Sequence, residues 1–134
     1  MTKKEWLGRY NSLQGDIERT ENEIQRWRAR AQSVTQHITD MPKGGQNRNQ
    51  LEDAVCAIDE LEQELSGQIL ESIAVRKEIA AAIEAVRNPV YRELLKRRYI
   101  DGDKWERIAV EMNYCYRHVV HVLHPKALHA LNIS

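Results

Sequence analysis

A seven-residue repeat near the start of the chain constrains its fold more than any other feature. From Trp6 onward, positions spaced alternately four and three residues apart are apolar, with Thr20 as the one exception. The positions between them are mostly charged or amide side chains, as in a coiled coil that packs one stripe against a partner helix. The sequence therefore predicts a long helix whose seam consists of Trp6, Tyr10, Leu13, Ile17, Thr20, Ile24, Trp27, Ala31, Val34 and Ile38.

Residues 41–47 are rich in helix-breaking residues and predict the end of this helix. They include Pro42, which cannot donate its backbone amide, and two adjacent glycines. A second seam follows in residues 51–86, and two long helices joined by a short loop are expected to fold back as an antiparallel hairpin. With the same four-three alternation, this seam is predicted to consist of Leu51, Val55, Ile58, Glu62, Leu65, Ile69, Ser72, Arg76, Ile79, Ile83 and Val86.

The charge distribution indicates that the chain has two parts. Residues 1–86 hold 11 Lys and Arg against 15 Asp and Glu, whereas residues 87–134 hold 9 against 5, although the whole chain is neutral. We predict a hairpin in residues 1–86 that forms a homo-oligomer, since two helices alone leave apolar surface uncovered. No run of 18 apolar residues occurs, which predicts a cytoplasmic protein with no membrane partner. Cys56 and Cys115 are expected to be free thiols.

Residues 87–134 are predicted to form three short helices. Asn88 and Pro89 favour the start of the first, which is strongly basic and ends near Tyr99. Asp103 is placed to cap the second, over residues 104–112. A turn at residues 113–115 follows, with Asn113 as the expected left-handed residue. The third helix should run over residues 116–131, kinked or broken at Pro125, and bury Val119, Leu123, Ala127, Leu128 and Leu131.

Two helices joined by a tight turn form a helix-turn-helix, whose final helix fits the major groove of double-stranded DNA. Side chains near the start of that helix would reach base edges, and Arg117 could donate two hydrogen bonds to guanine. The predicted base contacts are Tyr116, Arg117, Val120, His121 and His124. The predicted contacts to the phosphate backbone are Arg97, Arg98, Lys104 and Arg107.

The stretch YRELLKRRYIDGDKWERIAVEMNYCYRHVVHVLHPKALHAL, residues 91–131, resembles the fourth conserved region of bacterial sigma factors. It is more closely similar to phage late transcriptional regulators of the ArpU/RinA type, which join such a region to a helical N-terminal part. The resemblance covers about a third of the chain. It implies sequence-specific activation of phage genes in a bacterial host, at the nucleoid and with host RNA polymerase as a candidate partner. It also places Arg117 and His118 where the recognition helix begins.

Other classes of function are weighed against this interpretation. We find no catalytic series or nucleotide-binding motif, so we expect no enzyme and no cofactor. His118, His121 and His124 recur at three-residue spacing as in a zinc site, but no carboxylate or thiolate obviously completes the set. A phage small terminase subunit would usually carry its DNA module first. A helical interaction protein that contacts RNA polymerase instead of DNA remains a further alternative.

Overall fold

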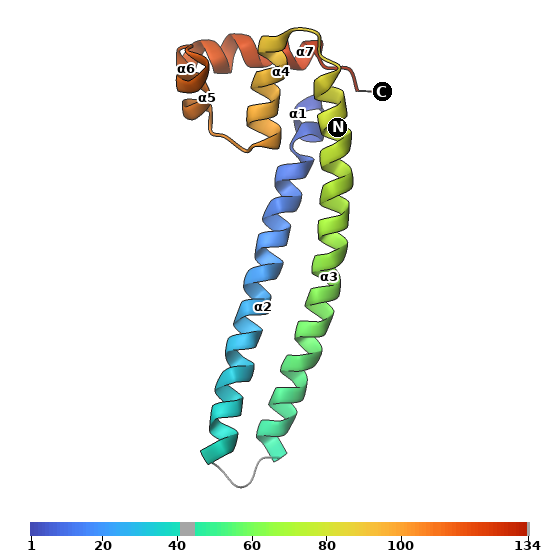
Figure 1. Cartoon of the computed structure of the whole chain (residues 1–134), viewed down its shortest axis with the longest axis vertical. Coiled ribbons are helices and arrows are strands. Elements are labelled where there is room, and N and C mark those ends of the chain that lie inside the picture. Colours follow the sequence, from blue (N-terminus) through green and yellow to red (C-terminus); the bar gives the residue numbers. More distant parts are fainter. Residues whose placement is uncertain (41–44, 134) are drawn as a thin grey trace. The chain divides into compact units, whose positions relative to one another are not determined.

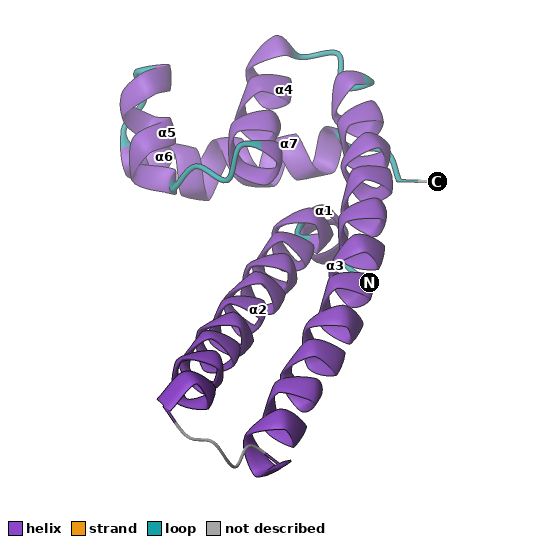
Figure 2. Cartoon of the chain, turned by 60° about the horizontal axis from the view of Figure 1, so that its bottom comes forward, coloured by secondary structure: helices purple, strands orange, loops and turns teal. Residues whose placement is uncertain are grey.

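The computed structural model describes the backbone of residues 1–40 and 45–133, and the side chains of residues 1–35 and 48–133. No strand occurs among the described residues, which confirms the all-α prediction (Figure 2). A pair of long helices is followed by shorter C-terminal helices (Figure 1). In chain order the elements are α1 (Lys3–Leu7), α2 (Arg9–Asp40), α3 (Gly45–Glu84), α4 (Pro89–Leu95), the π-helical segment η1 (Lys96–Ile100), α5 (Trp105–Met112), α6 (Tyr116–His118), the π-helical segment η2 (Val119–Leu123) and α7 (His124–Ala130).

The chain forms two compact units, which we call the head unit and the hairpin unit. The head unit consists of Met1–Gln14 together with Glu71–Ser134, and the hairpin unit is Gly15–Leu70. This division differs from the predicted one after residue 86, because the first 14 residues and the end of α3 belong to the head. The head unit holds 14 Lys and Arg against 9 Asp and Glu, and the hairpin unit 6 against 11. The opposite charges of the two parts are therefore more pronounced than the predicted division indicated.

Within the hairpin unit, α2 and α3 run antiparallel and side by side (Figures 1 and 2). The predicted seam of α2 is confirmed there: Ile17 and Ile24 are buried, and later seam positions are half-buried up to the last described one. Thr20 is also buried, and its hydroxyl donates to the Asp16 carbonyl oxygen at 3.1 Å. This hydrogen bond is how the one polar seam position satisfies its hydroxyl. The predicted seam residue Ile38 lies outside the described side chains.

The predicted seam of α3 is wrong at four of its eleven positions, Val55, Glu62, Ile69 and Arg76, which are exposed, whereas the other seven, including Ile83, are buried or half-buried. Val55 is 57% exposed and Ile69 is 39% exposed, whereas Ala54 is buried. The helix also begins at Gly45, within the predicted turn, of which residues 41–44 lie outside the described residues. Counted from Leu51, the buried positions of α3 are spaced alternately three and four residues apart, in the reverse order of the predicted spacing. This order passes over the charged side chains Glu62 and Arg76. The buried and half-buried positions that follow this spacing are Leu51, Ala54, Ile58, Leu61, Leu65 and Gln68, continued in the head unit by Ser72, Val75, Ile79, Ala82 and Val86; Ile83, next to Ala82, is also buried.

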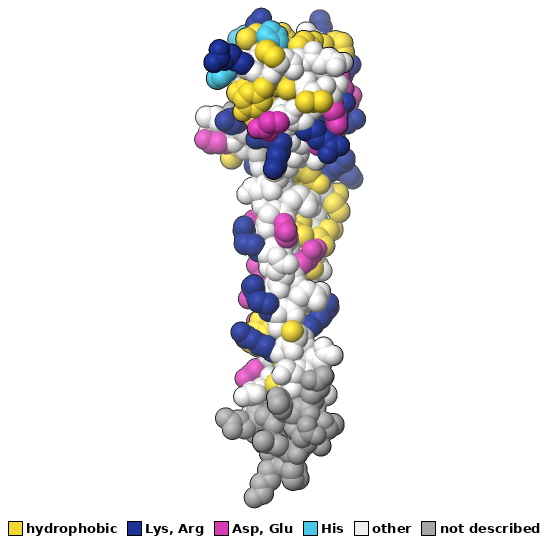
Figure 3. Space-filling model, turned by 90° about the vertical axis from the view of Figure 1, so that its left-hand side faces the viewer, with side chains coloured by type: hydrophobic (Ala, Val, Ile, Leu, Met, Phe, Trp, Pro, Cys, Tyr) yellow, Lys and Arg dark blue, Asp and Glu magenta, His cyan; other side chains and the backbone are white. Residues whose placement is uncertain are grey.

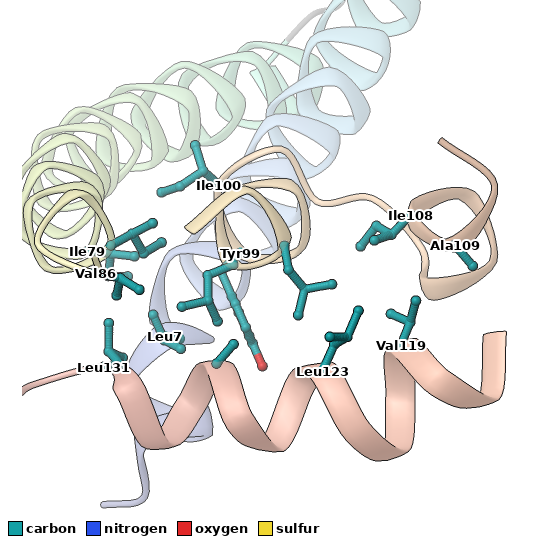
Figure 4. Close-up of a cluster of buried hydrophobic side chains, with 14 of the residues drawn as sticks. Leu7, Ile79, Val86, Tyr99, Ile100, Ile108, Ala109, Val119, Leu123 and Leu131 are labelled. Atoms are coloured by element: carbon teal, nitrogen blue, oxygen red, sulfur yellow. The ribbon is translucent and has the colours of Figure 1, made fainter. Parts of the chain in front are cut away.

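The core of the head unit joins residues from both ends of the chain. Leu7 of α1, Ile79 of α3 and Leu131 after α7 are all fully buried in it (Figure 4). Thr2 caps α1: its hydroxyl accepts from the Glu5 amide at 3.1 Å, and the Glu5 carboxylate accepts from the Thr2 amide. Because α1 supplies core side chains, the three C-terminal helices do not form the head by themselves.

The first C-terminal helix begins as predicted. The Asn88 side-chain oxygen accepts from the Val90 amide at 2.9 Å, and Pro89 occupies the first turn. The turn after η1 contains Gly102 at φ +74°, a left-handed conformation that glycine adopts without strain. The predicted cap at Asp103 is wrong by one residue, since the N-cap of α5 is Lys104, which makes no side-chain capping bond.

Pro125 does not break the last helix, because α6, η2 and α7 follow one another without interruption (Figure 4). Proline cannot donate a backbone hydrogen bond, and the turn before it is wide: the His124 amide donates to the Val119 carbonyl, five residues earlier. Val119, Leu123, Ala127 and Leu131 are buried as predicted, and Leu128 is half-buried. One helical run therefore spans residues 116–130.

Candidate nucleic-acid interface

The turn between α5 and α6 fixes where the last helix begins. Asn113 has φ 60° and ψ 41°, which confirms the predicted left-handed residue. Its amide and that of Tyr114 donate back to carbonyls of α5, the latter to Ala109 at 3.0 Å. Cys115 is extended at the N-cap and makes no side-chain capping bond. Two helices are thus joined by three residues, an arrangement consistent with a helix-turn-helix.

Three of the predicted base contacts lie on the outer face at the start of this helix. Tyr116, Arg117 and His121 are exposed, and Tyr116 retains 47% of its surface. Arg117 has no ion pair among the described residues. A shallow depression on the surface of the head unit is lined by Cys115, Arg117, His118, His121 and Val122. The exposed face therefore presents one free guanidinium and two imidazoles around a concave patch.

His118 and Val120 lie at the edges of this face. Both are half-buried, and the His118 ring stacks on Tyr114 with ring centroids 5.6 Å apart. The stack ties the Tyr114 side chain of the turn to the helix that follows it.

Near the top of Figure 3, Lys, Arg and His side chains lie beside hydrophobic ones on the surface. The surface thus mixes cationic and apolar groups, as at interfaces that contact both phosphates and bases.

His124 was predicted as a base contact, and the structure places it in the core instead. It is only 7% exposed, its Nε2 lies 2.7 Å from the Tyr99 hydroxyl, and its ring centroid is 4.5 Å from that of Trp105. Burial, with a smaller contribution from the nearby charges of Lys4 and Arg98, lowers its pKa to about 4. His124 is therefore a neutral packing residue and is unavailable to a ligand at the surface.

The predicted phosphate contacts differ in how free they are. Lys104 is exposed, but Arg98 is half-buried, with its guanidinium 4.5 Å above the Trp105 ring and a hydrogen bond to the Asp103 carbonyl at 3.1 Å. Arg98 therefore holds the turn before α5. Arg107 is exposed but pairs with Glu111, through its Nε at 3.0 Å.

Arg97 is held by two carboxylates. It pairs with Glu93 at 3.0 Å and also with Glu111. Hydrogen bonds from Arg107 and Arg97 lower the pKa of Glu111, so its carboxylate is charged at neutral pH. Sequence analysis missed Glu111. The spacing of four residues between Arg107 and Glu111 on one helix could have indicated the pair, whereas the contact with Arg97 needs the tertiary fold.

Two further findings concern other kinds of site. In the described part of the chain, no group of three or more His, Cys, Asp or Glu side chains is placed to hold a metal ion, and the burial of His124 separates it from His121. None of the described helices is long and apolar enough to cross a membrane. Sequence analysis also missed Val110 of α5, an apolar side chain that is 76% exposed.

Comparison with known families gives a match that covers residues 31–132 and hence about three quarters of the chain. The matched region contains much of the hairpin unit and all three C-terminal helices. No curated protein and no solved structure matches the chain significantly. On the extent of the family match, the chain belongs to the family described as protein of unknown function (DUF1492).

Proposed function

We propose that this protein is a sequence-specific regulator of transcription that binds double-stranded DNA through the helical run over residues 116–130. One observation carries the proposal: Arg117 and His121 are exposed at the start of this helix, while Val119 and Leu123 anchor its opposite face in the core. A rigidly held helix with polar side chains at its start suits base-edge recognition in the major groove. Arg117 is the side chain that we expect to discriminate between bases.

The charge of the head unit supports a polyanionic partner. Its excess of five cationic over acidic residues contrasts with the acidic hairpin unit. The exposed Lys104 precedes α5, and the exposed Tyr116 begins α6, so both could contact phosphates beside the groove. The resemblance to phage late regulators supports a role in activating phage genes, and a direct contact with host RNA polymerase fits the same role.

The hairpin unit supports self-association, which would place two head units on one duplex. Leu70 and Val55 of α3 are 69% and 57% exposed, which leaves apolar surface for a second copy. A homo-oligomer gains affinity from two linked binding events, provided that both heads reach their half-sites. We therefore propose that the hairpin unit forms the oligomer and the head unit reads the DNA.

The test of DNA reading begins with selection of bound duplexes from a random-sequence pool. The affinity of the selected duplex and of a scrambled duplex is then measured by fluorescence anisotropy at several salt concentrations. Arg117→Ala should reduce the preference for the selected duplex by about 5- to 150-fold, the range for one bidentate base contact. Lys104→Ala should instead weaken both duplexes alike and lower the salt slope by about one.

Two results would contradict this proposal at different points. If Arg117→Ala keeps the wild-type preference, the recognition helix is wrongly assigned. If wild-type protein selects no sequence and binds no duplex, the protein is not a DNA reader.

A protein contact through the head unit is the second candidate function. Val110 and Tyr114 are both exposed, and four residues separate them on α5 and its turn. Exposed apolar side chains on a charged surface are typical of sites that bind another protein. Val110→Gln, which adds no charge, would then abolish the pull-down of purified RNA polymerase and leave duplex affinity intact.

A further inference from the structure

Four charged side chains form a continuous chain of ion pairs between two helical segments of the head unit. Glu93 of α4 pairs with Arg97 at 3.0 Å, Arg97 pairs with Glu111, and Glu111 pairs with Arg107 at 3.0 Å. Two cations and two anions cancel, so this cluster adds no net charge to the head. Two of the arginines expected to bind the DNA backbone are thus occupied by carboxylates.

The two arginines are not held equally. The Arg97 side chain is 25% exposed and has two carboxylate partners, whereas the Arg107 side chain is 68% exposed and pairs with Glu111 alone. An exposed ion pair within one helix contributes little to stability, because water screens it and the long side chain loses freedom. Glu111 therefore restrains Arg107 weakly, but it presents the same kind of ligand as a phosphate, namely a pair of anionic oxygens.

We propose that Glu111 limits the sequence-independent affinity of the protein for duplex DNA by holding Arg107 away from the phosphates. The inference rests on the proposed function and names a residue that tunes it. Each phosphate neutralised by a cation strengthens binding to any sequence equally. A paired Arg107 gives no such contact, so selected and competing duplexes are both bound more weakly. The pair therefore shortens retention on the great excess of competing sites that a genome offers, and it leaves the ratio between selected and competing affinities unchanged.

The test uses Glu111→Gln in the full-length protein. Glutamine keeps the size of the side chain and removes its charge. Affinity for the scrambled duplex should rise about twofold, as expected from the release of one exposed ion pair within a helix. The slope of log affinity against log salt should steepen by about 0.9, the value for one added phosphate contact. The ratio of selected to scrambled affinity should stay the same, because discrimination is a difference between two binding free energies and one added phosphate contact strengthens both equally.

Two comparisons separate release of Arg107 from a general change in charge. Glu106→Gln removes one negative charge from an exposed position on the same helix, where the described residues offer no ion-pair partner. It should leave the salt slope unchanged. Arg107→Ala should have little effect on duplex binding in the wild-type background. It should abolish the gain when it is combined with Glu111→Gln.

The outcomes distinguish this inference from the proposed function. Thermal unfolding followed by circular dichroism establishes that each variant is folded, and a merely structural role for Glu111 would lower the melting temperature without changing the salt slope. Equal slopes for Glu111→Gln and Glu106→Gln, in a protein that still selects sequences, would overturn the inference alone. Failure of the wild-type protein to bind any duplex would overturn both.

Discussion

His124 makes the stability of the head unit dependent on pH in a way that can be calculated. Its ring is buried between Tyr99 and Trp105, and Nε2 lies 2.7 Å from the Tyr99 hydroxyl. Burial raises the pKa of Tyr99, so the phenol keeps its proton at neutral pH and can donate it to the imidazole. A protonated His124 would lose this acceptor and place a positive charge in the core near Lys4 and Arg98.

The magnitude follows from the two pKa values of His124. Burial lowers the pKa from the ordinary value of 6.5 to about 4 in the folded protein. Between these values the unfolded chain binds more protons than the folded one, so stability is complete above pH 6.5 and decreases as the pH falls to 4. The full difference corresponds to roughly 3 kcal/mol, of which about 2 to 3 kcal/mol is lost between pH 7 and pH 4.5.

The assay is urea denaturation of the wild type and of His124→Gln at several pH values. The variant should be less stable at pH 7, but it should lose about 2 to 3 kcal/mol less than the wild type on acidification to pH 4.5. Subtracting the stability-versus-pH profile of the variant from that of the wild type removes the loss caused by protonation of carboxylates, because both proteins share it. His129→Gln, at an exposed position of the same helix, should follow the wild-type profile. Equal acid losses in wild type and His124→Gln, or titration of His124 near pH 6.5 by NMR, would refute this reasoning.

Two further predictions test the division into units. Leu70→Glu should lower the molar mass measured by light scattering, because it places a charge in the exposed apolar surface of the hairpin unit; Gln25→Glu adds the same charge on α2 and should not. An unchanged mass for Leu70→Glu would place the oligomer contact elsewhere. Leu7→Ala should reduce the free energy of unfolding by about 2 to 5 kcal/mol, since it empties space in the head core, and the exposed Met1→Ala should have no measurable effect. Equal unfolding free energies would mean that α1 is not part of the head.

The features that could be predicted from the sequence are those that depend on near neighbours. The cap at Asn88 needs only the next three residues, and the left-handed Asn113 follows from the short turn around it. The first seam was also predictable, because its period is regular over many residues. The second seam was wrong at four positions because two orders of spacing, four-three and three-four, start from the same Leu51. Avoiding charge at Glu62 and Arg76 would have selected the right order.

Other features depend on contacts between distant parts of the chain. Leu7 lies beside the predicted seam, so its place in the head core followed from no periodic pattern. The capping box of Thr2 and Glu5 was a local signal for a separate first helix, and it was visible in the sequence. The ion pair between Arg97 and Glu111 had no such signal, because the partners lie 14 residues apart on different helices. The sequence therefore identified the candidate cations without showing which of them are free.

His124 lies in the core because the helical turn before it is wide. The same turn limits how far the proposed DNA interface extends along the helix. The buried residues Val119, Leu123, Ala127 and Leu131 recur every four residues, and in an α-helix each such step would rotate the side chain by about 40°. A π-helical turn holds more residues, so η2 takes up part of this rotation and keeps the stripe toward the core. The same widening turns His124 away from the face of His121. The four-residue spacing of these buried positions before Pro125 thus goes with a wide turn in this helix, and it confines the side chains proposed to read bases to the start of the helix.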